Sequence, residues 1–584
     1  MSGQLDRRAF LAAGGAAALG GCHCRLPPLP PPATKALSDG HAHFFNAADL
    51  PVAGFVKYVL IPRYIGDAPD LVLALVDIFA AVAKFLSVSA ATELLGLNEG
   101  TLSMKEQVSA IAFGRVAEKA HREGLAGRRY APIPASIEET EDEARTDIAL
   151  RRMAGHDQLA RLLQPRVAGK ADIVLDAQAF ARIAGDSDAS LPLPAARENP
   201  DLQCDKSDPA APLGLKAISV ESLIRWAFLL CQPRCRHVLS YLAAARLEGH
   251  QVRDAVNLLV DYDKWLDDSP GRGSDHADQV AYWTRYDAVS RRAGWPIRLH
   301  TFAGYDPLKH AEEMEASGKN SVYFERLTQW VLAGRNSDLS ASHRVAGFKI
   351  YPPMGFRPDT NAHIVIPDTA NGRAIRKRWE NRLARLGPAL DCALKVFFDF
   401  CLKHDVPIMT HARESNVALP GHGQDAEPGH WITRAAQLAA DYPGRALRLC
   451  MGHFDLENCH SASQTDEAAL SAALALNQAR HPDGSPKGHI YFDISFDDRI
   501  VAGGSEAAAF LNRLARISNQ AGDACKHLLF GSDWIMLANQ KEAPRYLANA
   551  WAATQGLDSP FTDALRERMF RTNLLDFLNL PPTA

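Results

Sequence analysis

Short apolar runs that alternate with helix-length amphipathic segments most constrain the fold of this chain. From about residue 250 onward, each apolar run is followed by a segment with helical periodicity. This alternation is typical of βα units, whose strands lie parallel in one sheet. Together with one run near the N-terminus, the apolar runs are residues 36–40, 255–260, 296–302, 345–351, 406–410, 446–451, 489–494 and 527–530. A (β/α)8 barrel needs eight such units, so the sequence predicts an α/β fold with a TIM-like barrel.

The first two predicted strands are separated by a long stretch without a strand rhythm. Residues 53–249 contain helical patterns, for example at 102–122 and 220–247. We therefore expect a mainly helical insertion there, after a first barrel strand and loop at 36–52. The remainder of the barrel is expected over residues 250–584.

The composition is that of a globular protein with no general affinity for nucleic acid. The 584 residues are 47% hydrophobic and 23% charged, and the net charge is −4, whereas nucleic-acid binding is typical of strongly basic chains. Residues 71–91 are apolar, but Asp77 and Lys84 interrupt them. Because unpaired charges are costly inside a bilayer, we expect a buried or amphipathic helix there. No pattern indicates an oligomeric state.

The first 22 residues resemble a bacterial export signal. Arg7-Arg8 precedes Phe10-Leu11 and an apolar run rich in Ala and Gly, which resembles a twin-arginine signal. Leu19-Gly20-Gly21-Cys22 resembles a lipobox, which would leave Cys22 as a lipidated N-terminus. The alternative is cleavage nearby without lipidation. Residues 23–35 would form a Pro-rich linker, and the protein is expected to be periplasmic or a membrane-anchored lipoprotein whose lipid anchor is its only membrane contact.

Residues of the types that bind metals stand at the ends of several predicted strands. His41 and His43 follow the first strand and would point the same way, because residues two apart share a face of a strand. The others are Lys349 in the fourth strand, His411 after the fifth, His453 after the sixth and Asp533 after the eighth. Since the C-terminal strand ends of a barrel meet at one mouth, this set predicts an open site for a divalent cation.

Each of these residues also has a plain structural explanation when it is taken alone. The Ser-Asp before Trp534 could cap a helix, Lys349 could pair with a carboxylate, and each His could be a hydrogen-bonded residue of the core. The prediction of a metal site therefore rests on the agreement of order, spacing and residue type across the whole set.

The segments that carry these residues resemble the amidohydrolase superfamily, and more narrowly its amidohydrolase-related branch, which also holds decarboxylases. They are DGHAHFF, GFKIYPPMGF, VPIMTHARE, LCMGHFD and LLFGSDW. The resemblance implies that His41, His43 and Asp533 bind a divalent metal, with His411 as a further ligand. Zn²⁺ is the expected ion, with Mn and Fe as alternatives.

The resemblance leaves the number of metal ions open. In binuclear members a carbamylated lysine at the position of Lys349 bridges two ions, and residues equivalent to His411 and His453 hold the second. In mononuclear members His411 joins the single ion, and His453 is free for acid/base work or for orienting the substrate.

The resemblance implies hydrolysis of a small molecule at an amide, lactone, ester or similar C–N or C–O bond. A metal-bound water would be the nucleophile, Asp533 would pass its proton to the leaving group, and His453 would stabilise the oxyanion where it is not a ligand. Arg413, which follows His411, and Tyr351, which follows Lys349, are candidates for the substrate pocket. The Arg413 guanidinium would suit a carboxylate group of the substrate. Asp261 and His300, which we expect near the ends of the second and third strands, and Asp455, which follows His453, are further candidates for substrate contact or for orienting a ligand.

Two other functions remain as alternatives. A metal-dependent, non-oxidative decarboxylase would use the same ligand set, and one metal with unmodified Lys349 would favour it over hydrolysis. The third hypothesis is a lipoprotein whose barrel has lost catalysis and serves as a binding platform. The intact ligand set argues against it.

Overall fold

The computed structural model of the protein describes the barrel and only part of what precedes it. The described residues are 35–60, 87–97, 229–230, 232–266, 273–292, 297–318, 320–413, 417–456, 466–540, 543–556 and 559–580. The predicted export signal and most of the Pro-rich linker lie outside these residues, as do the helical pattern at 102–122 and most of the apolar stretch at 71–91.

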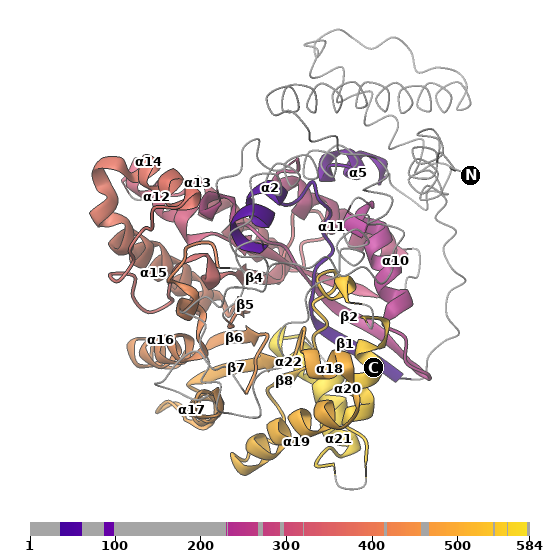
Figure 1. Ribbon diagram of the computed structural model, residues 1–584. Coiled ribbons are helices and arrows are strands. Elements are labelled where there is room, and N and C mark those ends of the chain that lie inside the picture. Colours follow the sequence, from indigo (N-terminus) through magenta and orange to yellow (C-terminus); the bar gives the residue numbers. More distant parts are fainter. Residues whose placement is uncertain are drawn as a thin grey trace, which may run out of the picture.

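Eight parallel strands form one sheet in chain order (Figure 1). They are β1 (Lys35–Ala42), β2 (His250–Leu258), β3 (Arg298–Tyr305), β4 (Gly347–Ile350), β5 (Ile408–His411), β6 (Leu447–Gly452), β7 (Gly488–Asp493) and β8 (Leu528–Leu529). The sheet closes on itself where the Gly40 amide donates to the Phe530 carbonyl (2.8 Å) and the Asp533 amide donates to the His41 carbonyl (2.7 Å). The predicted (β/α)8 barrel is thereby confirmed.

Some strand limits differ from the prediction. β1 extends to Ala42, so His41 lies inside the strand and not beyond its end. Its pairing with β2 shifts register between Leu37 and Ser38 and again between Asp39 and Ala42. Such irregularities insert extra residues into one strand and change where its side chains point, which hydrophobic periodicity alone does not predict.

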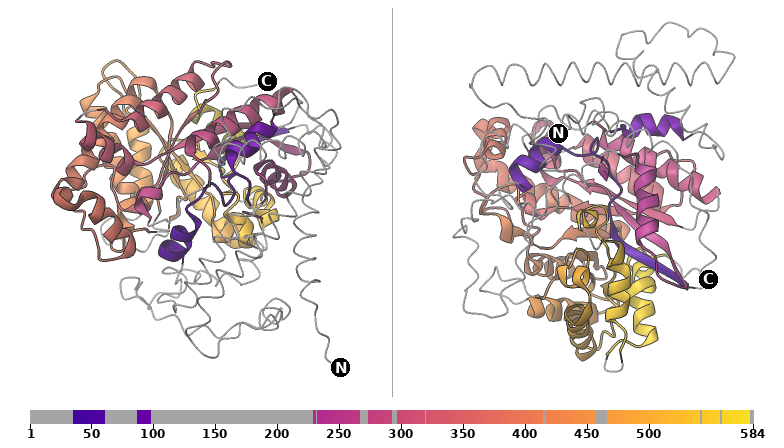
Figure 2. Two further views of the ribbon diagram at one scale, coloured as in Figure 1. Left: turned by 90° about the horizontal axis from the view of Figure 1, so that it is seen from above. Right: turned by 45° about the vertical axis from the view of Figure 1, so that its right-hand side comes forward.

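Helices cover the outside of the sheet, as the view from above in Figure 2 shows. Between the strands lie α11 (His276–Arg292), α12 (Pro307–Ser317), α13 (Val322–Arg335), α14 (Ala370–Trp379), α15 (Leu386–His404), α16 (Pro428–Asp441), α17 (Asp466–Gln478), α18 (Asp498–Ala502) and α19 (Gly504–Gln520). After β8 come α20 (Tyr546–Ala553), α21 (Asp563–Glu567), the π-helix η9 (Arg568–Thr572) and α22 (Asn573–Phe577). Within the described ranges, no helix is both long and apolar enough to cross a bilayer.

The start and the end of α12 follow from its sequence. The Asp306 carboxylate accepts a hydrogen bond from the Leu308 amide, and Pro307 occupies the first turn, where it needs no amide hydrogen. Gly318 ends the helix at a φ of 87°, a left-handed conformation that glycine adopts without strain. These signals set the length of α12 before any tertiary contact is made.

The described part of the predicted insertion is helical. It consists of α2 (Val52–Phe55), the π-helix η1 (Val56–Leu60), α5 (Ala90–Gly96) and α10 (Arg234–Ala244). The Arg234 guanidinium attaches α10 to its surroundings: Nη1 lies 3.1 Å from Glu93, Nη2 donates to Asp49, and Nη2 also donates to Ser274 Oγ (3.0 Å). All three charged groups are buried, so this ion-pair network joins α10 and α5 to the loop after β1.

The lower part of the barrel interior is apolar, and α22 closes it. Phe577 packs against Phe302 of β3 and Tyr491 of β7, with ring centroids 6.1 and 5.2 Å apart. The same cluster contains Val256, Leu258, Met409, Cys450, Leu529, Leu574 and Leu578. Because alternate residues of a strand share a face, the inward positions two residues beyond Met409 and Tyr491 are His411 and Asp493. The strands therefore place an apolar layer at the bottom of the barrel and a polar layer at its C-terminal mouth.

Candidate metal centre

The structure brings His41, His43 and Asp533 together at the C-terminal mouth of the barrel. All three are buried, and their potential ligand atoms lie within 4.8 Å of one another. Asp533 Oδ1 is 3.2 Å from His43 Nε2 and 3.7 Å from His41 Nε2. Two ligand atoms on one tetrahedral zinc ion, each at about 2.1 Å, are roughly 3.4 Å apart. The three residues therefore fit a shared divalent cation.

Hydrogen bonds to the other ring nitrogen orient both histidines. His41 Nδ1 donates to Asp493 Oδ2 (2.8 Å), and His43 Nδ1 donates to the Leu258 carbonyl (2.7 Å). A carbonyl and a carboxylate accept but do not donate, so the proton of each ring is on Nδ1. This leaves the Nε2 lone pairs facing Asp533, which is the arrangement that metal-binding histidines require.

Asp493 contacts the candidate centre, although we do not predict it from the sequence. It is the last residue of β7 and is fully buried. Its Oδ2 holds His41, while its Oδ1 accepts from the backbone amides of His453 (3.1 Å) and Ser495 (3.0 Å). The signal was available, because a carboxylate interrupts an apolar strand there. The apolar run predicts a strand that continues to Ile494, so Asp493 is not expected at its end.

Lys349 lies in the same centre, as its position in the fourth strand predicts. Its Nζ is 3.4 Å from His41 Nε2, and its side chain is buried. Burial lowers the pKa of Lys349 to about 8, although the negative charges of Asp493 and Asp533 oppose this shift. A larger fraction of the amine is therefore neutral at ordinary pH than for an exposed lysine.

His453 connects the group to His411. The ring centroid of His453 lies 4.5 Å from that of His41 and 4.4 Å from that of His411. Burial, followed by the neighbouring His41, lowers the pKa of His453 to about 3. Burial is also the largest cause that places the pKa values of His41 and His411 well below the usual 6.5. Neutral imidazoles result, and only a neutral imidazole can bind a metal ion.

Two residues of the centre have an unusual backbone conformation. His453 and Asp533 have φ values of 59° and 55°, in the left-handed region that few non-glycine residues adopt. The glycines near them give His41 its space: a Cβ on Gly452 would lie 2.9 Å from His41 Cε1, and one on Gly531 would lie 2.7 Å from His41 Cβ. Such conformations are common at functional sites, where the surrounding structure holds them.

The two predicted substrate residues lie beside this group. Tyr351 contacts His411, with ring centroids 4.5 Å apart. Arg413 Nη2 is 3.5 Å from Asp455 Oδ2, and 31% of its side chain is exposed. The other oxygen of Asp455 accepts from Arg499 (2.8 Å). Asp455 therefore contacts two arginines, of which Arg499 also pairs with Asp497 (2.6 Å).

The other candidate residues have different roles in the structure. Asp261, in the loop after β2, forms an ion pair with Lys309 (2.6 Å). His300 is the third residue of β3, and its Nε2 lies 2.8 Å from Asp254. The prediction that His300 lies near the end of its strand is wrong, because β3 continues to Tyr305. His300 lies toward the opposite end of the barrel from the metal centre.

Comparisons with known proteins found two partial structural matches. No protein-family model matches the chain, and no curated protein is similar to it. A protein named as a metal-dependent hydrolase, from Lactobacillus casei, has a TM-score of 0.31 and 13% identity, over 62% of this chain and 78% of that one. An amidohydrolase from Burkholderia multivorans has a TM-score of 0.31 and 13% identity, over 61% and 92%. Similarity at this level does not bear on activity, so the function is inferred from the site.

Proposed function

We propose that this protein is a metal-dependent hydrolase of the amidohydrolase superfamily, from its amidohydrolase-related branch. The proposed substrate is a small molecule with an amide, lactone, ester or similar C–N or C–O bond. One observation carries the proposal: the Nε2 atoms of His41 and His43 face the carboxylate of Asp533 while both Nδ1 atoms donate to fixed acceptors. Three ligands arranged in this way leave an open coordination position.

Each residue of the centre has a role in this reaction. A divalent cation bound there would polarise the substrate and lower the pKa of a bound water to near 7. Asp533, 3.2 Å from His43, would accept a proton and deliver it to the leaving group. His453 donates its Nδ1 proton to the Ser495 carbonyl (3.1 Å). Its Nε2 then carries the lone pair and would be able to bind an ion.

Metal analysis of the purified full chain tests this proposal. Wild-type protein should retain at least one tightly bound transition-metal ion per chain, and the double variant His41→Asn/His43→Asn should lose that ion together with any hydrolase activity. His300→Gln is the matched control, because it changes a histidine on another barrel strand that pairs with Asp254 away from the centre. Full metal content in the double variant would overturn the ligand assignment, and a metal-free wild-type chain would favour a binding protein without catalysis.

The environment of Lys349 supports keeping decarboxylation as a second function. With a pKa of about 8, the amine is partly neutral near pH 7 and open to carbamylation, yet most of it is still protonated and able to donate a proton to a carbon atom. Mass spectrometry of the intact protein, with and without bicarbonate, separates the two. A carbamate on Lys349, with two ions per chain lost from the His41→Asn/His43→Asn variant, would favour hydrolysis, whereas an unmodified lysine with one ion lost would favour decarboxylation.

We also propose that Arg413 recognises a carboxylate of the substrate. Its side chain is 31% exposed, so the guanidinium is open to a ligand, and its charge acts on the neighbouring His411. Replacing it with Gln should raise KM for a carboxylated substrate far more than it lowers kcat. The matched control is Arg434→Gln, a change on α16. Equal effects of the two changes would contradict this role.

We propose, further, that the protein is exported by the twin-arginine route and anchored by lipid at Cys22. The support is the Arg7-Arg8 pair and the lipobox-like sequence that ends at Cys22. Labelling of growing cells with radioactive palmitate should mark the wild-type protein and leave Cys22→Ala unlabelled. Lysines in place of Arg7-Arg8 should retain the precursor in the cytoplasm, and export of that variant would contradict the route.

A further inference from the structure

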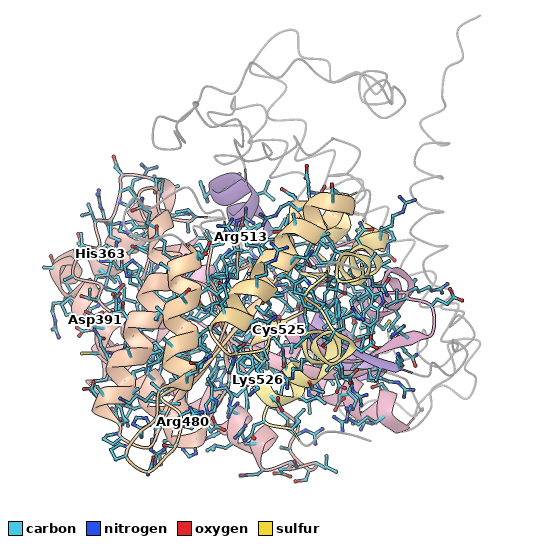
Figure 3. The ribbon with its side chains drawn as sticks, turned by 90° about the horizontal axis from the view of Figure 1, so that it is seen from below. His363, Asp391, Arg480, Arg513, Cys525 and Lys526 are labelled. Carbon is cyan, nitrogen blue, oxygen red and sulfur yellow. The ribbon has the colours of Figure 1, made fainter. Side chains whose placement is uncertain are left out.

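We propose a second metal site, formed by His363, His422 and Asp425, on two loops at the barrel mouth. His363 lies in the loop between β4 and α14, and Figure 3 shows it at the edge of the molecule. His422 and Asp425 lie between β5 and α16, where Asp425 is part of the short 3-10 helix η6 (Gly423–Ala426). The potential ligand atoms of the three residues lie within 4.8 Å of one another.

The distances in this cluster are somewhat shorter than those between ligands on one ion. His363 Nε2 is 3.0 Å from both oxygens of Asp425, and His422 Nδ1 is 2.8 Å from Asp425 Oδ2. Ligand atoms on a tetrahedral ion are roughly 3.4 Å apart, so a small outward movement would admit an ion between them. His422 and Asp425 are buried and His363 is partly exposed, which leaves one side open to solvent.

Neighbouring groups orient the cluster as they orient His43 in the first site. The His422 Nε2 lies 3.0 Å from the Val365 carbonyl, which only accepts, so this nitrogen carries a proton. Arg357 Nε donates to Asp425 Oδ1 (2.5 Å) and leaves Oδ2 to the two imidazoles. Burial opposes protonation of His422, but the hydrogen bond to Asp425 raises the pKa of His422. A proton therefore lies in the 2.8 Å gap between His422 Nδ1 and Asp425 Oδ2 when no ion is bound, and a bound ion would replace that proton.

The ligand types indicate which ions suit the site. Two imidazole nitrogens and one carboxylate oxygen are ligands for Zn²⁺, Co²⁺ or Ni²⁺, whereas Ca²⁺ and Mg²⁺ prefer oxygen ligands. The hydrogen bonds that hold His422 and Asp425 are the outer contacts that built metal sites have.

An ion in this position would fasten together the two loops that carry the proposed substrate residues. The first loop begins at Tyr351, directly after β4, and the second contains Arg413, after β5. The loops already contact each other where the Ala418 amide donates to the Pro353 carbonyl (3.1 Å). An ion bound by His363, His422 and Asp425 would therefore hold one wall of the mouth in place. It would take no part in the chemistry at His41 and His43.

Metal content after reloading tests the site. Full-length protein is stripped with a chelator, reloaded with Zn²⁺, dialysed and analysed for zinc. The double variant His363→Ala/His422→Ala should hold about one ion per chain fewer than the wild type. His430→Ala is the matched control, because His430 on α16 pairs with Asp359 (3.1 Å) and links the same two segments outside the cluster. It should keep the wild-type zinc content.

The unaltered chain provides a second measurement that does not depend on how the variant folds. A crystal of the Zn²⁺-loaded wild-type protein, measured at the zinc absorption edge, should show an anomalous peak between His363 and His422. Zinc at the first site with no peak here would overturn the proposal, as would equal zinc content in the double variant and the wild type. A peak that appears only in a large excess of zinc would also overturn it. The His41→Asn/His43→Asn variant should keep this ion, which separates failure of this proposal from failure of the proposed function.

Discussion

Replacing Asp493 with Asn should weaken metal binding by moving a proton on His41. Three donors, the amides of His453 and Ser495 and the Ser495 hydroxyl, all point at Asp493 Oδ1, while His41 Nδ1 and the more distant Cys450 thiol face Oδ2. An asparagine would keep its carbonyl oxygen on the three donors and place its NH₂ group against His41. Since NH₂ cannot accept, the asparagine favours the tautomer in which His41 Nδ1 accepts and Nε2 carries the proton, although the Ser495 hydroxyl, 3.1 Å from Nδ1, is a competing acceptor. In that tautomer, the nitrogen that faces Asp533 has no lone pair for a metal.

The size of this effect follows from the loss of one orienting contact. Losing such a partner of a metal-binding histidine typically weakens metal affinity by about 10- to 100-fold, or roughly 1.4–2.7 kcal/mol. Competition with a chelator measures the affinity, and circular dichroism checks the fold. The matched control is Asp523→Asn, which changes another buried carboxylate that pairs with a histidine, His527, just before β8. Wild-type affinity in the Asp493 variant, or an equal loss in the Asp523 variant, would refute the tautomer argument.

Three further predictions concern packing and charge. Arg234→Met should destabilise the fold by about 3–5 kcal/mol in urea unfolding, because it leaves two buried carboxylates without their counter-charge; an unchanged midpoint would contradict this. Gly452→Ala should reduce metal retention in chelator competition, since its Cβ would lie 2.9 Å from His41 Cε1 and displace the ring. Burial opposes the ionisation of Asp425, but hydrogen bonds from two imidazoles and a guanidinium outweigh it and lower the pKa from 3.8 to about 2. The ionised carboxylate therefore stabilises the fold above about pH 4, and this stability is lost as the pH falls toward 2; thermal melts of metal-stripped protein should show a smaller loss over that range for Asp425→Asn.

Much of the barrel could be predicted because its signals are local. An apolar run of about four to eight residues followed by an amphipathic segment predicts a βα unit, whatever the rest of the chain contains. The limits of the strands were less accurate, as the short β8 and the long β2 show. Strand ends depend on pairing with neighbours that are distant in the sequence.

The candidate site was predictable in part, for the same reason. His41, His411 and Lys349 stand at inward positions that the two-residue alternation of a strand defines. His300 has the same residue type but lies near the start of β3, and only the observed length of that strand places it away from the mouth. Asp493 could not be predicted because a single carboxylate in an apolar strand does not indicate a role by itself. Its role depends on its contact with His41, which only the structure shows.

What the sequence by itself determined is the number and order of the βα units and the residue types that reach the mouth. What only the tertiary structure decided is which atom of each residue faces the centre. The proton positions on His41 and His43 depend on Asp493 and Leu258, which lie 452 and 215 residues away along the chain. The pairing of His363 with His422 and Asp425 likewise arises only when two loops meet. Hydrogen bonds between such distant groups form only after the barrel has closed, so no local pattern in the sequence encodes them.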